Sequence, residues 1–299
     1  MPVRFRNFTD TPGFSEDFNK VRDFLVDINN EKVIAPGFLW GRWEWAFSLP
    51  FLDTASLSRI GIWEDGGRIA AVATYESNLG HAYFLIRKGY ESLKKEMLMY
   101  AKDNLLSGGK INALIPDGDL DFQRAAFGLG FRPTQSKEHN AMMDIKSESL
   151  TYDLPQGFSI TSLDRDFDMY KYNRVLWRGF NHEGEPPADE KSIEERRISV
   201  SGPHDDLRLK VAVVSLKGDF VSYCGMWCDP STSYALVEPV ATDPDFRRMG
   251  LGRAAVLECV RRCGEMGAKY AYVGSSQQFY YSIGFYPIST ETFWELTTE

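Results

Sequence analysis

The feature that most limits the fold of this chain is an internal repeat. Residues Phe127–Pro133 read Phe-Gly-Leu-Gly-Phe-Arg-Pro, and residues Tyr281–Pro287 read Tyr-Ser-Ile-Gly-Phe-Tyr-Pro. Each segment follows a pattern typical of a short strand and a short helix, and the elements before it come in a similar order in both halves. A chain of 299 residues is also longer than a single hydrophobic core usually supports. We therefore expect two similar domains, residues 1–150 and 151–299, that meet near residues 147–156.

Hydrophobic patterns place the elements of each half. In the second half they predict strands at 158–163, 207–216, 221–227, 234–242, 269–274 and 288–296, and helices at 166–180, 253–266 and 277–283. In the first half they predict strands at 3–8, 59–64, 69–75, 82–86, 110–115 and 140–145, and helices at 15–29, 92–106 and 121–129. Hairpins alternate with helical crossovers, so we expect an α+β fold in which each domain has a mixed, mostly antiparallel sheet flanked by helices.

Charge and hydropathy argue against nucleic acids and membranes as partners of this chain. The chain has a net charge of −8, and its basic residues form no cluster of the kind that follows a nucleic-acid backbone. No apolar run approaches the roughly twenty residues of a membrane span, and the first ten residues lack the apolar core of a secretion signal. We expect no nucleic-acid or membrane partner, a cytoplasmic location, and a monomer or homodimer.

The four cysteines lie at Cys224, Cys228, Cys259 and Cys263. Their spacing of four within each pair suggests metal ligands, but the first pair falls in a predicted strand, where that separation spans about 13 Å. Chelating pairs usually lie two to four residues apart on a turn. We therefore favour reduced, partly buried thiols and expect no metal site.

A glycine-containing loop is the most informative segment for function. Residues 234–242 form a predicted strand, and Arg247–Gly252 lead from it into a predicted helix that starts at Arg253. Gly250 and Gly252 let the backbone approach a ligand closely, and the N–H groups of the first helical turn favour an anion. The patterns of P-loop and dinucleotide-binding proteins do not match. The loop therefore indicates a pyrophosphate site, with a glycine-rich helix start as the alternative.

Arg247-x-x-Gly250-x-Gly252, after a strand that ends Ala241-Thr242-Asp243-Pro244, resembles the acetyl-CoA loop of the GNAT superfamily of N-acetyltransferases. The later segment Tyr280–Phe285 resembles the closing helix of that family. The two motifs are separated by the expected helix and strand. The resemblance covers residues 157–296 strongly and residues 3–145 only in element order. It implies a tandem GNAT protein that transfers the acetyl group of acetyl-CoA to a primary amine of a small molecule or peptide, by direct attack in a ternary complex.

The resemblance also implies roles for single residues. A bulge near Pro239 would open the strand so that the backbone of Val240, Ala241 and Thr242 pairs with pantetheine. The loop residues would hold the pyrophosphate: Arg247, Arg248, Met249, Gly250, Leu251, Gly252 and Arg253. Tyr280 would protonate the leaving thiolate, with Tyr281 as the alternative. Glu238 is the candidate base, against a purely structural salt bridge. Ser275 or Gln277 would replace an asparagine that many members carry.

The first half departs from the GNAT pattern. Its loop, residues 86–93, has one glycine and carries Glu91 near the expected anion site, and Ala126 stands where Tyr280 stands in the second half. We therefore expect a degenerate domain without cofactor, which packs on the catalytic domain and helps shape the acceptor pocket. Residues 181–187 lie where the family's acceptor loop falls, with an ordinary solvated loop as the favoured alternative. His182 is a second base candidate, against a simply exposed histidine. The aromatic residues Trp40, Trp43 and Trp45 suggest a core or interface cluster more than a ligand pocket. A catalytically silent acyl-CoA sensor and a transferase for another acyl group are the rival functions.

Overall fold

The computed structural model describes residues 3–29, 33, 36–146 and 150–298. The chain divides into two compact units, of which unit 1 comprises Met1–Asn140 with Pro287–Glu299 and unit 2 comprises Ala141–Tyr286. Each unit has a mixed, mostly antiparallel sheet with helices on both faces, as the sequence predicts. Residues 147–149 of the expected junction at 147–156 lie outside the described residues.

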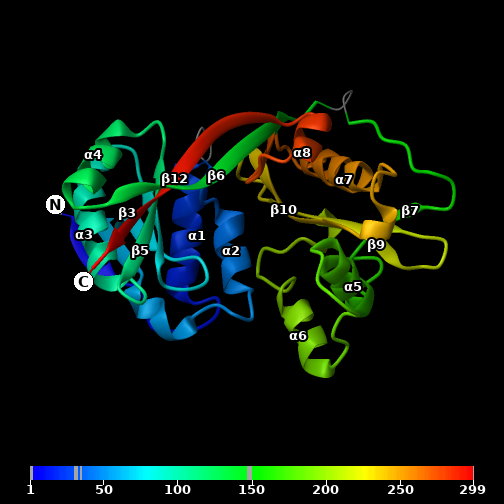
Figure 1. Ribbon diagram of the computed structural model, residues 1–299, viewed down its shortest axis with the longest axis horizontal. Helices are drawn as coiled ribbons and strands as arrows, with labels where there is room; N and C mark the ends of the chain where they lie inside the picture. The colour runs from blue at the N-terminus through cyan, green and yellow to red at the C-terminus, as the bar shows by residue number, and fades with distance from the viewer. Residues whose placement is uncertain (1–2, 30–32, 34–35, 147–149, 299) are drawn as a thin grey trace. The chain divides into compact units, whose positions relative to one another are not determined.

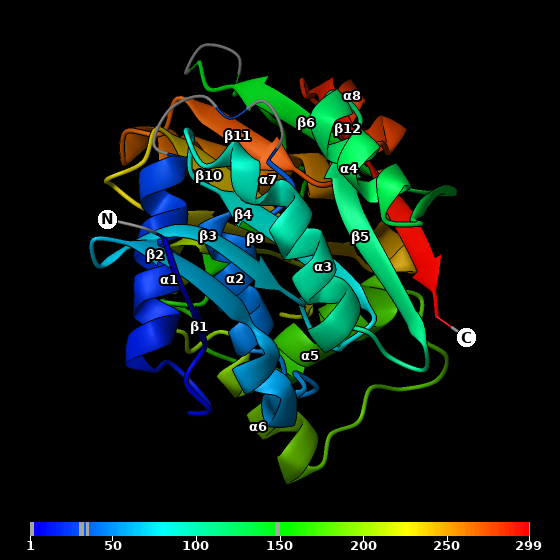
Figure 2. The same cartoon turned by 90° about the vertical axis from the view of Figure 1, so that its left-hand side faces the viewer.

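The sheet of unit 1 has the strand order β1-β2-β3-β4-β5-β12-β6. The strands are β1 (Arg4–Asn7), β2 (Gly61–Asp65), β3 (Arg68–Thr74), β4 (His81–Ile86), β5 (Lys110–Pro116), β12 (Tyr286–Thr297) and the first part of β6 (Arg132–Asp144). Neighbours from β1 to β4 pair antiparallel, as do β5 and β12, whereas β4 and β5 pair in parallel. Helices α1 (Glu16–Ile28) and α2 (Trp40–Phe47) cover one face, and α3 (Lys94–Asn104) and α4 (Leu120–Gly128) cover the other (Figures 1 and 2).

Unit 2 repeats this plan with the strand order β6-β11-β10-β9-β8-β7. Its strands are β7 (Ser159–Ser162), β8 (Lys210–Val214), β9 (Phe220–Cys228), β10 (Tyr234–Thr242), β11 (Tyr270–Val273) and the end of β6. Helices α7 (Leu251–Glu265) and α8 (Gln278–Ser282) lie on one face, and α5 (Met169–Gly179) and α6 (Glu190–Ile198) lie on the other (Figure 1). Short 3₁₀ turns complete the two units at Thr54–Arg59, Glu91–Leu93, Leu207–Leu209 and Pro244–Phe246.

Each sheet contains a strand from the other half of the sequence. Strand β12, from the end of the chain, pairs with β5 of unit 1, where Glu291 lies opposite Pro116. The end of β6, from the first half, pairs with β11 of unit 2, where Ala141 lies opposite Val273. The units of the structure therefore differ from a division at residue 150. The pattern of one strand identifies it as a strand but says nothing about its partner.

The core of unit 2 forms where α7 packs on the sheet. Small residues such as Ala254 and Ala255 are fully buried there, which lets the helix approach the strands closely. All four cysteines are free and buried, and the Sγ of Cys259 donates to the carbonyl oxygen of Cys224 at 3.2 Å. Burial raises the pKa of the Cys224 thiol. Over the described residues there is no group of three or more His, Cys, Asp or Glu side chains placed to hold a metal ion.

The tryptophan-rich segment of unit 1 is a helix. Trp40 and Trp43 are buried, and the ring of Trp43 stacks on Phe18 of α1 with centroids 5.9 Å apart. The Nε1 of Trp43 donates to the carbonyl oxygen of Phe18, so these aromatics belong to the core between α1 and α2. Within the described part of the chain, every helix is too short or too polar to cross a membrane.

Candidate functional site

Strands β10 and β11 of unit 2 part to form one side of a pocket. The two parallel strands pair only from Tyr234 to Leu236, and β10 then continues alone on that side. The register against β9 shifts between Val237 and Val240, so the bulge that the sequence predicts around Pro239 is present. Gly225 lies opposite the bulge, where a Cβ would come within 2.8 Å of the carbonyl oxygen of Glu238. The bulge and the parting strands leave part of the β10 backbone edge available to a ligand.

The glycine loop after β10 presents a row of N–H groups. Its backbone turns through positive φ at Arg248 (62°) and Gly250 (82°), and α7 begins at Leu251. No acceptor in the described ranges of the chain bonds the N–H groups of residues 248–253. These groups lie at the positive end of a fifteen-residue helix. The loop can therefore bind an anion with several oxygen atoms, such as a pyrophosphate.

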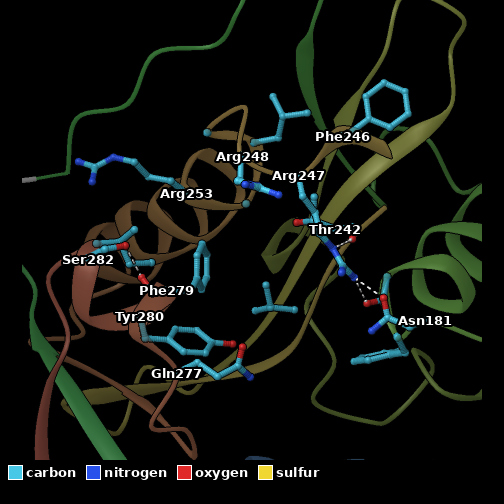
Figure 3. A pocket seen from close by; sticks show the side chains of 17 residues that line it. Asn181, Thr242, Phe246, Arg247, Arg248, Arg253, Gln277, Phe279, Tyr280 and Ser282 are labelled. Atoms are coloured by element: carbon cyan, nitrogen blue, oxygen red, sulfur yellow. Dashed lines mark hydrogen bonds between the residues drawn. The ribbon is translucent and has the colours of Figure 1, made fainter. Parts of the chain in front are cut away.

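Arg247 fixes the position of this loop. Its Nε donates to the carbonyl oxygen of Thr242 at 3.1 Å, and its Nη2 donates to the carbonyl oxygen of Gly179 at 2.9 Å and to Oδ1 of Asn181 at 2.8 Å (Figure 3). The guanidinium thus ties the end of β10 to the end of α5. Sequence patterns place Arg247 among the anion ligands, whereas in the structure its side chain holds the protein's own backbone.

A second tether joins α5 to the start of the loop. Nε of Arg178 lies 2.6 Å from Oδ2 of the buried Asp243, and Nη1 of Arg174 lies 3.3 Å from the same oxygen. Burial alone would raise the pKa of Asp243, but the hydrogen bonds from Arg178 and from the N–H of Asp245 outweigh it and lower the pKa. Gly179 allows the close approach, since a Cβ there would lie 2.9 Å from the amide nitrogen of Thr242. The loop is therefore held from two sides before any ligand arrives.

The parted strands, the loop and helix α8 enclose a pocket of about 730 Å³. Ten of the predicted site residues line it: Val240, Thr242, Arg247, Arg248, Gly250, Leu251, Gly252, Arg253, Gln277 and Tyr280. The other lining residues are not predicted as single site residues: Gly179, Phe180, Asn181, Phe246, Phe279, Ser282 and Ile283. Of these, Asn181 belongs to the expected acceptor loop, and Ser282 and Ile283 belong to the closing-helix motif. An aromatic beside Tyr280 is a sequence signal for Phe279. The residues of the α5 end are brought there by tertiary packing, which no local pattern predicts.

Four predicted site residues lie outside the pocket lining. Ala241 is buried and packs with the core on the α5 side of the sheet. The Met249 side chain is exposed, which leaves only its backbone N–H for a ligand. The hydroxyl of Ser275 accepts the N–H of Gln277 at 3.2 Å and so stabilises the start of α8. Glu238 is half-buried on the bulge. Of the two candidates for a polar group after β11, only Gln277 reaches the pocket.

Tyr280 points its ring into the pocket from α8 (Figure 3). Its ring packs edge-on against Phe279 and Phe285, with centroids 5.0 and 5.7 Å away. Burial raises the pKa of Tyr280, and the nearby Cys224 and Glu238 raise it further, so the hydroxyl keeps its proton at neutral pH. Tyr281 does not line the pocket. Glu238 therefore acts electrostatically on Tyr280, which lines the pocket.

The loop after α5 contributes Asn181 to the pocket but not His182. The His182 ring packs on Trp177, with centroids 4.5 Å apart, and Nε1 of Trp177 donates to the carbonyl oxygen of Gly184. The histidine is thus held against α5 and does not line the pocket.

A family model described as the acetyltransferase (GNAT) family matches residues 169–287, which include the whole pocket. These residues belong to the GNAT family. A search among curated proteins returned no match. Two solved structures are similar over 99% of this chain. A tandem GNAT protein from the clavulanic acid biosynthesis pathway has 14% identity, 98% of its own chain covered and a TM-score of 0.63. A GCN5-related N-acetyltransferase from Sphaerobacter thermophilus has 13% identity, 95% coverage and a TM-score of 0.59.

N-myristoyltransferase of Saccharomyces cerevisiae, solved with bound myristoyl-CoA, is also similar over 99% of this chain and 79% of its own, with 10% identity and a TM-score of 0.54. At these identities the similarity shows the fold. The whole chain therefore has the tandem GNAT fold, as the resemblance of its motifs indicates.

The strands of unit 1 also part, but a loop N–H group there is bonded by a side chain of the protein itself. Strands β4 and β5 pair only at His81 and Ala82 and then separate, as β10 and β11 do. In the loop that follows β4, the N–H of Gly89 donates to both carboxylate oxygens of Glu91 at 3.0 Å. The hydrogen bond from Gly89 lowers the pKa of Glu91. The N–H of Gly89 therefore already has an acceptor within the protein, whereas the N–H groups of residues 248–253 in unit 2 have none among the described residues.

Proposed function

We propose that unit 2 transfers the acetyl group of acetyl-CoA to a primary amine of a small molecule or peptide. The observation that carries this proposal is the row of N–H groups at residues 248–253, which have no acceptor in the described chain and lie beside the parted strands. The pyrophosphate would bind these N–H groups, and the pantetheine arm would pair with the β10 edge at Val240–Thr242. The pocket of about 730 Å³ is large enough for a ligand of this kind.

The chemistry requires few side chains. The neutral amine attacks the thioester carbon while a backbone N–H of β10 stabilises the charge that develops on the carbonyl oxygen. Glu238, directly or through water, accepts the proton that the amine loses. The carbon–sulfur bond then breaks, and Tyr280 donates its proton to the departing thiolate. The proximity of Glu238 to the pocket and the protonated state of Tyr280 support these roles.

We further propose that each chain binds one acetyl-CoA. The Glu91 carboxylate accepts a hydrogen bond from the N–H of Gly89, and the position that corresponds to Tyr280 of unit 2 is Ala126. A pyrophosphate at the unit 1 loop would have to displace a carboxylate of like charge. On this proposal, unit 1 lacks the transfer chemistry, and the protein acts as a cytoplasmic monomer or homodimer.

The rival functions are an acyl-CoA sensor without turnover and a transferase for another acyl group. The experiment that separates them measures CoA release from acetyl-, propionyl- and succinyl-CoA over a panel of primary amines. Tyr280→Phe should cut turnover and leave acetyl-CoA affinity within about twofold, and Tyr281→Phe is the matched control. No release of CoA with any amine, despite tight binding, would favour the sensor. Faster release from another acyl-CoA would favour the other transferase.

A further inference from the structure

The parted strands of unit 1 contain a smaller pocket of their own, of about 160 Å³. Its walls are mostly apolar and include Phe38, Tyr83 and Leu114. The carboxyl group of Glu291, on β12, is the one acidic group among its described lining residues. Glu291 is 5% exposed. Once ionised, a buried carboxyl group at an apolar pocket needs a partner, because an isolated charge in such surroundings is costly.

The carboxyl group has a built position. A Cβ on Gly37 would lie 1.8 Å from the Oε2 of Glu291, so only glycine at this position leaves room for it. Asn140 of β6 donates to the same oxygen at 3.4 Å, a long hydrogen bond. Within the described residues, no Lys, Arg or His forms an ion pair with Glu291. The carboxyl group is therefore held in place with one weak hydrogen-bond donor.

Arg42, which acts electrostatically on Glu291, is already committed to other groups. Arg42 of α2 bonds Glu138 through Nη1 at 2.7 Å and Nη2 at 2.9 Å, and it bonds both oxygens of Glu76. Nη1 also bonds the carbonyl oxygen of Gly37, and Nη2 shares its hydrogens with the hydroxyl of Tyr83 at 3.1 Å. The single positive charge of Arg42 is thus already shared by the two carboxylates of Glu76 and Glu138, and Glu291 would be a third. An ionised Glu291 adds a further negative charge, which a cation in the pocket would compensate.

We propose that this pocket binds a small primary ammonium ion. Its ammonium group would pair with the Glu291 carboxylate, and its hydrocarbon part would lie against the apolar walls. An apolar cavity of about 150 Å³ holds a molecule of the size of benzene, so 160 Å³ has room for a small organic cation. An n-butylammonium ion has this size and charge. The site is separate from the pocket of unit 2, and every described residue that lines it belongs to unit 1.

The test uses the full chain and n-butylammonium chloride in calorimetric titrations at pH 8, where the Glu291 carboxyl group is ionised, and at constant ionic strength. We expect saturable binding with a Kd on the order of 1–10 mM, as suits so small a ligand. The isosteric variant Glu291→Gln should bind at least tenfold more weakly. The control Glu295→Gln removes an exposed carboxylate from the same strand and should bind as the wild type does. Neutral n-butanol and anionic butyrate should each bind at least tenfold more weakly than n-butylammonium.

Three results would overturn the proposal. One is the absence of saturable n-butylammonium binding to a wild-type protein whose circular dichroism shows it folded. Another is equal affinity of Glu291→Gln and wild type. The third is equal affinity for n-butanol, which would make the pocket a purely apolar cavity. None of these results bears on acetyl-CoA binding in unit 2, so the failure of this proposal is distinguishable from failure of the proposed function.

Discussion

Replacing the buried carboxyl group of Glu291 with an amide should change how stability depends on pH. Burial and then the nearby Glu138 raise the pKa of Glu291 to about 7, from an ordinary value of 4.5. The folded chain therefore holds this proton to a higher pH than the unfolded chain does. Between pH 4.5 and about 7 the folded state binds more protons, so the free energy of unfolding falls as the pH rises.

The size of the effect follows from that interval. Each pH unit between the two pKa values is worth about 1.4 kcal/mol, so the ionised carboxyl group costs the wild type about 3 kcal/mol above pH 7. Glutamine cannot ionise and has a similar shape. We therefore expect Glu291→Gln to be within about 1 kcal/mol of the wild type near pH 5 and to exceed its stability by about 3 kcal/mol at pH 8.

Urea unfolding at pH 5 and pH 8, followed by tryptophan fluorescence in the absence of amines, measures this difference. Trp63 and Trp294 report on unit 1, where Glu291 lies. Glu295→Gln, on the same strand, is the control and should show no comparable change between the two pH values. A Glu291→Gln variant that is no more stable than the wild type at pH 8 would contradict the raised pKa. So would a difference in the free energy of unfolding that is the same at both pH values.

Three further predictions concern the pocket of unit 2. Tyr280→Phe should lower kcat for acetyl transfer by about 100-fold or more, since it removes the general acid; steady-state kinetics check this, and an unchanged kcat would exclude Tyr280 as that acid. Arg247→Ala should raise KM for acetyl-CoA several-fold, because it removes the hydrogen bonds that tie the loop to α5. A KM equal to that of the wild type would show that these hydrogen bonds have no role in binding. Gly250→Ala should cost about 1–2 kcal/mol of stability, measured by urea unfolding, because φ there is 82° while no atom lies within 4 Å of the added Cβ; Gly118→Ala, also without close neighbours, is the control.

The parts of the fold that depend on local pattern could be predicted from the sequence. The strand at 234–242 matches β10, and the helix predicted from Arg253 begins two residues earlier, at Leu251. The glycine spacing predicts the loop because a positive φ at Gly250 and exposed N–H groups are local properties of the backbone.

The parts that depend on distant partners could not be predicted. The exchange of β6 and β12 between the sheets is set by pairings more than 100 residues apart in sequence, such as Glu291 with Pro116. The same holds for Arg247, whose partner Asn181 lies 66 positions away, and for the cluster in which Arg42 meets Glu138. A charged side chain is visible in the sequence, but whether it meets a ligand or the protein itself is decided by tertiary packing.

The most direct test of the central claim is a crystal structure of the full chain with acetyl-CoA. We predict one molecule per chain, with its pyrophosphate on the N–H groups of residues 248–253 and its thioester between the β10 edge and Tyr280. Acetyl-CoA bound at the unit 1 loop near Gly89 and Glu91, with the loop of unit 2 making no contact with it, would contradict the account.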